Sequence, residues 1–555
     1  MTANPRPNFT HWLKSGNPWV WMTAGAVSLS LVMVFGLLLI IATNGLAHFW
    51  PARVAQVVRD GGDGTHETLL GEIVDAETVA AARVRDSGGR VPPDATVVKR
   101  LLLKVGNRDL GDSDFRWVPE PEITTPDYPA EAVVIERGEW GNFYGFVTGL
   151  SEHGKALDVA NVWAELAPRL QRGQALREQI AHIEKRDIGS VNYQLEQLRL
   201  RERVLGKAGD IAGQRALLAP RAALEARFVA LSDTLAGLNS EIKRDGLRVK
   251  TVTGVERTIS IDKIVRLYRP NQMRWREKIA HYFTKLGEFV SDEPREANTE
   301  GGVFPAIFGT VLMVMVMSVL VTPFGVIAAV YLREYAKPGP ITSAIRIAVN
   351  NLAGVPSVVY GVFGFGFFVY FLGGNIDRLF FADKLPAPTF GTPGLLWSAL
   401  TLALLTVPVV IVATEEGLSR IPRALREGSL ALGATKAETL WRTVLPMATP
   451  AMMTGLILAV ARAAGEVAPL MMVGVVKLAP SLPFDGDFPY LHLDRKFMHL
   501  GFHIFDVGFQ SPNVEAARPL VYATALLLVV IIMSLNLAAI QIRNRLREKY
   551  NAADH

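Results

Sequence analysis

The sequence contains no cysteine at any of its 555 positions. Without cysteine the chain cannot form disulfide bonds, cannot use a thiolate as a nucleophile, and cannot bind zinc or an iron–sulfur cluster through sulfur. Any exported part of the chain must therefore be stabilised by the burial of apolar side chains alone.

Several functional signatures are absent as well. No GxxxxGK[ST] sequence occurs, so the chain has no P-loop of its own for the phosphates of ATP. No Ser/His/Asp order and no paired carboxylates in a plausible cleft stand out, so we predict no catalytic residues and no enzyme activity. The net charge of +5 is small for this length. Since no basic stripe is interleaved with aromatic residues either, nucleic-acid binding is not expected.

Long apolar runs are abundant. Half of the residues are hydrophobic and 20% are charged. The first run, at 19–42, exceeds the apolar core of about 7–15 residues that a signal peptide has, so we predict a retained membrane helix. Further runs near or above the roughly 20 residues that cross a bilayer lie at 303–331, 347–372, 395–414, 451–475 and 517–540. The sequence therefore predicts six transmembrane helices.

Residues 51–302 form a polar insertion between the first two runs. Short strands are expected at 69–74, 96–105, 132–135, 247–252 and 257–261. Between them, apolar residues repeat at alternating spacings of four and three, as in a coiled-coil seam: Leu224, Phe228, Leu231, Leu235, Leu238 and Ile242. With an earlier helical stretch and a bend near 206–213, this pattern predicts a helical hairpin over 162–244. The sequence leaves open whether this hairpin serves internal packing only or is a prong that binds a partner.

Basic residues mark one side of the predicted bundle. They cluster in three places, namely Arg333, Lys337, Arg346; Arg420, Arg423, Arg426, Lys436, Arg442; and Arg543, Arg545, Arg547, Lys549. Basic residues of short loops stay in the cytoplasm. This places the tails 1–18 and 541–555 and the loop 415–450 of the 303–540 core in the cytoplasm, and the insertion outside.

One ionisable pair lies within an apolar run. Arg462 and Glu466 are four residues apart, so they are expected on one face of a helix. An arginine inside the membrane costs about 2.5–3.5 kcal/mol on insertion scales, so Arg462 should face protein or water. Its guanidinium suits an oxyanion such as phosphate, and Glu466 can hold it when the site is empty. A purely structural ion pair is the alternative.

Other residues complete the predicted substrate pathway. Pro356 and Pro469 interrupt their helices, and Ser357 can offer a hydroxyl to an anion. Close helix packing through small residues is the alternative interpretation of the segment around Ser357. Glu415 and Glu416, at the end of the fourth run, either pair with Arg462 in one state or face the cytoplasm.

A polar stretch, EGSLALGATKAETLWRTVLP, occupies residues 427–446 between the fourth and fifth runs. It has an acidic-small-small start at 427–429, a glycine at Gly433 and a hydrophobic-Leu-Pro close at 444–446. This pattern resembles the cytoplasmic EAA loop of ABC importer permeases. Residues 353–361 and 461–470 resemble the third and fifth membrane helices of phosphate-specific importers, best those of PstA-type permeases. The resemblance covers roughly 19–48 and 303–545, outside the insertion.

The resemblance implies a mainly α, polytopic membrane protein with the ABC importer permease fold, carrying a mixed α/β periplasmic insertion. It implies a subunit that moves inorganic phosphate across the bacterial inner membrane by ATP-driven import. Contact with an ATPase subunit is implied for Glu427, Leu430, Gly433, Ala434, Leu445 and Pro446. The alternatives are a permease for sulfate or molybdate, and a membrane-anchored sensor or scaffold with an external sensing domain.

The same resemblance implies the partners. A homologous permease subunit would complete a heterodimer in the membrane lipid. Two cytoplasmic ATPase subunits would bind ATP and Mg and drive the cycle, and a periplasmic phosphate-binding protein would deliver the cargo. No cofactor or metal is expected on this chain itself.

Overall fold

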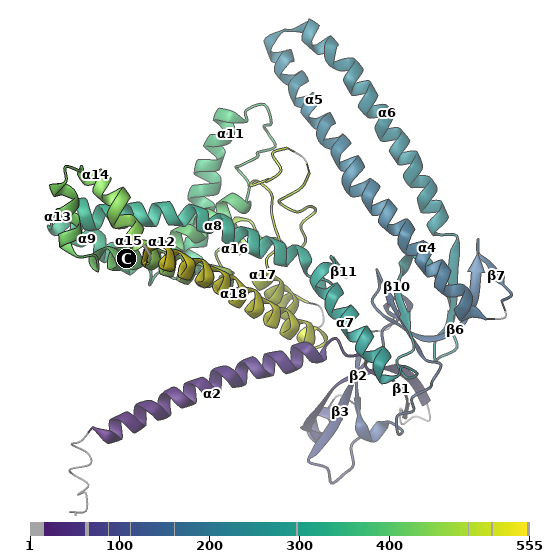
Figure 1. Ribbon diagram of the computed structural model, residues 1–555. Helices are drawn as coiled ribbons and strands as arrows, with labels where there is room; N and C mark the ends of the chain where they lie inside the picture. The colour runs from purple at the N-terminus through teal and green to yellow at the C-terminus, as the bar shows by residue number, and fades with distance from the viewer. Residues whose placement is uncertain are drawn as a thin grey trace, which may run out of the picture.

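The computed structural model describes residues 16–60, 66–86, 88–111, 113–159, 161–295, 298–486, 488–511 and 514–551. A helical bundle and a β-containing region lie at opposite ends of the molecule, and two long helices project from the latter (Figure 1). Most of the predicted tail at 1–18, and residues 552–555 of the tail at 541–555, lie outside the described residues.

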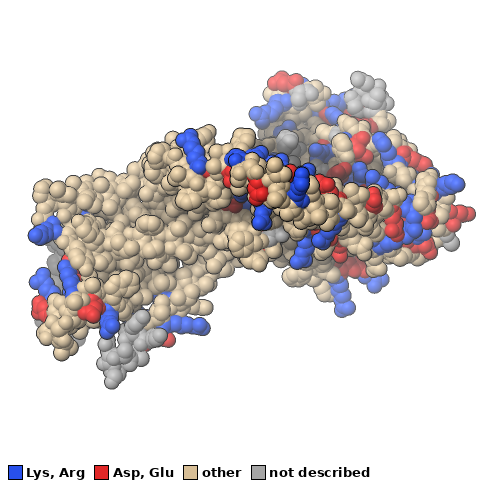
Figure 2. Space-filling view, turned by 90° about the horizontal axis from the view of Figure 1, so that it is seen from above, with Lys and Arg blue, Asp and Glu red and all other residues tan. Residues whose placement is uncertain are grey.

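Among the described residues, six helices are long and apolar enough to cross a membrane. They are Trp19–Ala47, Phe304–Tyr335, Ser357–Phe380, Leu395–Ser419, Lys436–Gly465 and Ala517–Glu548. Figure 2 shows the bundle as a broad surface nearly free of charged residues, between charges at its left end and a mixed-charge region on the right. This distribution confirms the predicted fold class of a six-helix membrane protein with a soluble region.

The bundle is divided into more elements than the apolar runs suggested. It contains α2 (Asn17–Ala47), α8 (Phe304–Val330) with η6 (Tyr331–Tyr335), α9 (Pro340–Leu352), α10 (Ser357–Phe363), η7 (Gly364–Gly373), α11 (Gly374–Phe380), α12 (Leu395–Ser419), α13 (Arg423–Ala431), α14 (Lys436–Thr439), η8 (Leu440–Val444), α15 (Leu445–Gly465), α16 (Leu470–Val473), α17 (Leu500–Phe505), η9 (Asp506–Gln510) and α18 (Val514–Asn551). The label C and helices α13 and α14 lie at the end of the bundle opposite the strands (Figure 1).

Two predicted spans have the wrong bounds. The span predicted at 347–372 is broken after Leu352, because Pro356 lacks a backbone donor and disfavours helix at the residue before it. The span predicted at 451–475 ends at Gly465 and begins earlier, near Lys436. Hydropathy reports the cost of transfer into lipid, and it does not register where the backbone leaves the helix.

Small residues let α12 and α15 approach closely. A Cβ added to Gly417 would lie 2.4 Å from the Cβ of Ala451, and one added to Gly455 would lie 2.7 Å from the Cβ of Ala413. Close backbone approach through small residues is the usual basis of helix association in lipid. The bundle core therefore forms around α12, with Leu402, Met317 and Ala463 among its fully buried residues.

The soluble region contains two antiparallel sheets and a short ribbon. One sheet has the order β1-β2-β3-β4, the larger has the order β10-β5-β6-β8-β9 with β7 beside β6, and β11 pairs with β12. The strands are β1 (Val54–Asp60), β2 (His66–Ala80), β3 (Val97–Lys104), β4 (Phe115–Pro119), β5 (Val133–Arg137), β6 (Phe143–Glu152), β7 (Lys155–Leu157), β8 (Asp245–Lys250), β9 (Glu256–Ser260), β10 (Ile264–Tyr268), β11 (Pro294–Arg295) and β12 (Glu300–Gly301). A short helix, α3 (Ala81–Asp86), follows β2.

A helical hairpin projects between β7 and β8. It consists of α4 (Val162–His182), a π segment η3 (Ile183–Ile188), α5 (Gly189–Ala208) and α6 (Ile211–Ile242). The turn uses Gly209 at φ +73°, and Asp210 caps α6 by accepting from the Gly213 backbone N–H. The hairpin predicted over 162–244 is present, and α5 and α6 run side by side (Figure 1). We call the whole hairpin, from α4 to α6, the arm.

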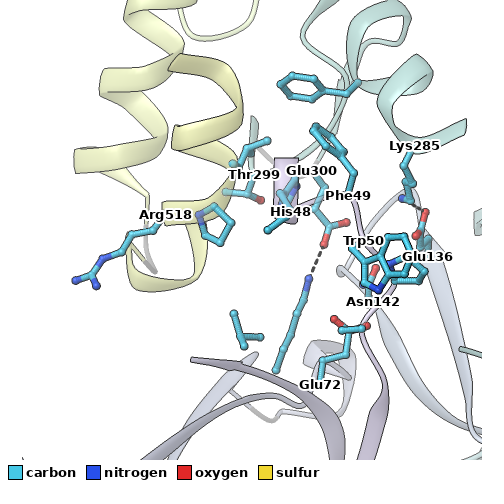
Figure 3. Close-up of a pocket in the computed structure, with 18 of the residues that line it drawn as sticks. His48, Phe49, Trp50, Glu72, Glu136, Asn142, Lys285, Thr299, Glu300 and Arg518 are labelled. Atoms are coloured by element: carbon cyan, nitrogen blue, oxygen red, sulfur yellow. Dashed lines mark hydrogen bonds and ion pairs between the residues drawn. The ribbon is translucent and has the colours of Figure 1, made fainter. Parts of the chain in front are cut away.

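The joint between the soluble region and the bundle surrounds a cavity of about 570 Å³. Helix α7 (Trp275–Ser291) borders it, and its Lys285 points toward Glu136 of β5 (Figure 3). Burial raises the pKa of Glu136, but the Lys285 ammonium and neighbouring cations outweigh burial and hold that pKa below its usual value. Phe49, after α2, packs on Phe289 of α7 with ring centroids 5.1 Å apart. These contacts fix the sheets relative to the membrane helices.

Candidate functional site

Arg462 and Glu466 form an ion pair at the end of the fifth span. Arg462 lies in the last turn of α15, and Glu466 is the first residue beyond it, with extended backbone at φ −83° and ψ 129°. The predicted common helix face is therefore wrong, because the helix ends between the two residues. Nevertheless Arg462 Nε lies 3.8 Å from Glu466 Oε1, with side chains 34% and 24% exposed. This long, partly accessible pair leaves the guanidinium available to a ligand.

The segment after α15 packs on α10. A Cβ added to Gly361 would lie 2.8 Å from the Cα of Pro469, so only glycine permits this contact. Pro356 caps α10 and Ser357 is its first residue, about one turn before Tyr360. The structure thus brings Pro469 to α10 and places Pro356 and Ser357 at the start of that helix.

Tyr360 lies near the start of α10 and makes a contact that the sequence did not reveal. It is buried, and its hydroxyl donates to the Leu352 carbonyl at 2.6 Å, which ties the end of α9 to α10. A single tyrosine inside an apolar run gives no signal of such a position.

Glu415 and Glu416 are engaged elsewhere. Glu415 pairs with Arg346 of α9 at 2.6 Å, and Glu416 pairs with Arg420 at 2.6 Å on the exposed end of α12. In this conformation neither carboxylate pairs with Arg462, and a pairing in another state of the transporter stays a prediction. The position of Glu416 four residues before Arg420 favours this local pair at the helix end.

The polar stretch 427–446 folds as a helix–turn–helix element. Gly433 ends α13 with φ +88°, a conformation that glycine adopts without strain. Thr435 then starts α14 with a capping box, in which its hydroxyl accepts from the Glu438 N–H and the Glu438 carboxylate accepts from the Thr435 N–H. The break predicted at Gly433 is thus a tight turn between two short helices.

Large apolar side chains are exposed on this element. Leu432 is 91% exposed, Trp441 is 74% exposed and Leu430 is 47% exposed. Of the other predicted contact residues, Glu427 and Gly433 are exposed, and Ala434, Leu445 and Pro446 are half-buried. We call Leu430, Leu432 and Trp441 the coupling surface. Large apolar side chains exposed next to charges are typical of interaction sites.

A half-buried ion pair anchors the coupling surface to the bundle. Arg426 of α13 pairs with Glu334, at the end of the second span, at 2.9 Å, and their side chains are 19% and 13% exposed. The same guanidinium donates to the carbonyls of Leu418 at 2.7 Å and Ile421 at 2.9 Å. A displacement of α13 would therefore act on the ends of the second and fourth spans at Glu334 and Leu418.

Glu334→Gln is expected to destabilise the protein by about 1–3 kcal/mol, because it removes the charged acceptor of a partly buried guanidinium. Thermal unfolding of the purified full chain in detergent measures this as a lower Tm. Glu416→Gln is the matched control, since that carboxylate is 61% exposed and its partner Arg420 is 75% exposed. Equal Tm values for the two variants would contradict the anchoring role.

Comparison with known proteins gives the family. Residues 321–548 match the model of the binding-protein-dependent transport system inner membrane component. The chain is 36% identical to phosphate transport system permease protein PstA 1 of Mycobacterium tuberculosis over 245 residues, covering 44% of this chain and 71% of that protein. It is 30% identical to phosphate transport system permease protein PstA of Yersinia pestis, covering 46% of this chain and 76% of that protein.

Among solved structures, the inward-facing MetNI methionine ABC transporter matches with a TM-score of 0.32 and 18% identity, covering 43% of this chain and 94% of that one. A score at this level does not define a fold, so the assignment rests on the sequence relatives. They are at least 30% identical, and the chain spans more than two thirds of their length. The chain belongs to the binding-protein-dependent transport system inner membrane components, and it is a PstA-type ABC transporter permease.

Proposed function

We propose that this chain is the permease subunit of an ATP-driven importer that carries inorganic phosphate across the bacterial inner membrane. Two relatives are named as phosphate transport system permeases. The ion pair of Arg462 and Glu466, at the end of a membrane helix, is the structural observation that supports an oxyanion as the cargo. A guanidinium fork can bind two oxygens of a tetrahedral oxyanion at once.

The geometry of the pair suits passage rather than tight binding. In the empty state the Glu466 carboxylate pairs with the Arg462 guanidinium at an Nε–Oε1 distance of 3.8 Å. A phosphate oxygen then replaces that carboxylate on Arg462, and Glu466 can accept a proton from the phosphate monoanion. One arginine cannot build a high-affinity anion site, so the ion can leave on the other side. Pro356, Ser357 and Pro469 would line the same pathway from α10 and its contact.

The missing P-loop requires a separate source of energy. Two cytoplasmic ATPase subunits would bind ATP and Mg and contact the coupling surface. The same contact would include Glu427, Gly433 and Ala434, and Leu445 and Pro446 at the start of α15. A homologous permease would form the other half of the pathway in a heterodimer. Both termini would then lie in the cytoplasm, with residues 51–302 in the periplasm.

Reconstitution tests this function. The full chain, its partner permease and the ATPase are placed in proteoliposomes with the binding protein, and uptake of radiolabelled phosphate is followed with and without ATP. We expect ATP-dependent uptake that excess sulfate or molybdate does not inhibit. Inhibition by either anion would instead indicate a broader oxyanion permease. If the chain does not retain an ATPase on purification, the alternative function, a membrane-anchored sensor or scaffold, is favoured.

The insertion would contact the phosphate-binding protein, because it lies at the end of the bundle where that protein delivers its cargo. Deletion of residues 55–298 is expected to raise the binding-protein concentration for half-maximal uptake by about tenfold, as loss of roughly 1.4 kcal/mol of contact would. Retention of the ATPase on purification shows that the shortened chain is assembled. An unchanged half-maximal concentration would contradict a docking role.

A further inference from the structure

The base of the arm is rigidly attached to the soluble region. Arg172 of α4 pairs with Asp245 of β8, whose side chain is buried. Arg177 donates to three backbone carbonyls, those of Ile261 at 3.3 Å, Asp262 at 2.8 Å and Ile264 at 2.8 Å. Charge-assisted hydrogen bonds with partly buried partners are the stronger class. The base of the arm therefore keeps its position.

Farther out, α5 reaches across to the membrane core. Arg203 donates to the carbonyls of Asp383 at 2.8 Å and Leu385 at 3.0 Å, and Lys207 pairs with the Asp383 carboxylate at 2.7 Å. At the other end of α5, the Tyr193 hydroxyl donates to the Phe488 carbonyl at 2.9 Å. One helix thereby bridges two connections on the same side of the bundle, between spans three and four and between spans five and six.

These outer contacts are exposed to solvent, which makes them weaker than the partly buried contacts at the base. Lys207 and Asp383 are 60% and 43% exposed, and an exposed ion pair contributes about 0.2–1 kcal/mol. A cavity of about 380 Å³ separates Leu198 and Val204 of α5 from Phe380 and Phe381, so the apolar side chains there are incompletely packed. Between the firm base and this weak contact lies η3, six residues of π-helix with none buried. Such segments in helices frequently mark functional positions.

The bridged connections follow the elements of the proposed pathway. The connection with Asp383 follows the third span, which contains Tyr360 and Gly361, and the one with Phe488 follows Arg462, Glu466 and Pro469. Opening of a pathway between these elements toward the soluble region has to move their outer connections. A helix fixed to both connections opposes that movement until its contacts break.

We propose that α5 is a releasable latch across the outer side of this permease, attached when that side is closed and released when it opens. The proposal rests on the proposed transport function and adds its regulation by the insertion. The weak α5 contacts can break at little cost in each cycle, whereas the base of the arm stays attached and returns α5 to the same loops.

This chain contains no native cysteine, so a cysteine pair introduced into it allows a direct test. Lys207→Cys and Asp383→Cys are combined in the full transporter and bridged with a short bis-methanethiosulfonate, which added thiol removes. We expect bridging to reduce ATP-driven phosphate uptake at least about tenfold, the effect of roughly 1.4 kcal/mol on the barrier, and thiol to restore it. The matched control is Glu202→Cys with Arg221→Cys, a pair 3.2 Å apart within the arm, whose bridging should leave uptake unchanged.

A second measurement does not depend on phosphate. Spin labels at the same two cysteines report the distance between α5 and the 383 connection in the complex, without nucleotide and trapped with ATP and vanadate. We expect a shift to longer distances in one of the two states. Identical distances in both states, or bridged uptake equal to thiol-treated uptake, would show that α5 is a static brace. A distance change without phosphate uptake would retain the latch and reject phosphate as the cargo.

Discussion

Replacement of Arg462 by glutamine is expected to lower the rate of phosphate uptake by roughly 10- to 100-fold. Glutamine is similar in length but has no charge, so the anion loses charge-assisted hydrogen bonds of about 1.5–3 kcal/mol. Glu466→Gln should reduce uptake as well, because it removes the group that holds the guanidinium and can accept a proton. Initial rates of radiolabelled phosphate uptake in proteoliposomes, at equal amounts of assembled complex, measure both effects.

Two further arginine variants separate a role in transport from a role in packing. Arg462→Lys keeps the charge but loses the bidentate fork, so uptake should fall between the values for the native chain and Arg462→Gln. Arg420→Gln removes the arginine of another i,i+4 pair, on an exposed helix end, and should not change uptake. Unchanged uptake in both Arg462→Gln and Glu466→Gln would refute the assignment of the pathway.

The sequence predicted the features that follow from local patterns. Apolar runs identified the six spans, because burial in lipid requires about 20 apolar residues in a helix. The seam from Leu224 to Ile242 predicted the hairpin, and Gly433 predicted the break before α14. Each of these signals lies within a few helical turns of the chain.

The other features of the fold and of the candidate site depend on contacts between residues that are distant in the sequence. The helix end at Gly465 separates Arg462 from Glu466; Gly465 and Pro469 indicate a break in this run but do not fix the residue at which the helix ends. Tyr360 lies near the candidate site only because α10 packs against Pro469, beyond the end of α15. Likewise Arg203 and Asp383 are 180 residues apart, and nothing in either neighbourhood predicts their contact. Pairing of β6 with β8 across the hairpin is equally nonlocal.

Loss of the ATPase is the expected result of changing the coupling surface. Leu432 is 91% exposed and Trp441 is 74% exposed, so neither side chain stabilises the isolated chain appreciably. In an interface, truncation of a central tryptophan typically costs about 2 kcal/mol or more, and Trp441→Ala should weaken ATPase binding by roughly 30-fold. Leu432→Asp should be more severe, since it would bury an unpaired carboxylate against the partner.

Co-purification of the ATPase with the tagged full chain, followed by titration of ATPase onto the permease, measures both coupling-surface variants. Val229→Asp provides the control, because Val229 is a large apolar residue 56% exposed on α6, at the other end of the molecule. That variant should bind the ATPase normally. If Leu432→Asp and Trp441→Ala also bind it normally, the ATPase does not contact this surface, and α13 and α14 are only a connector between membrane helices. If both lose it while their Tm values are unchanged, the ATPase binds at this surface, and the Arg426–Glu334 pair links α13 to the second span.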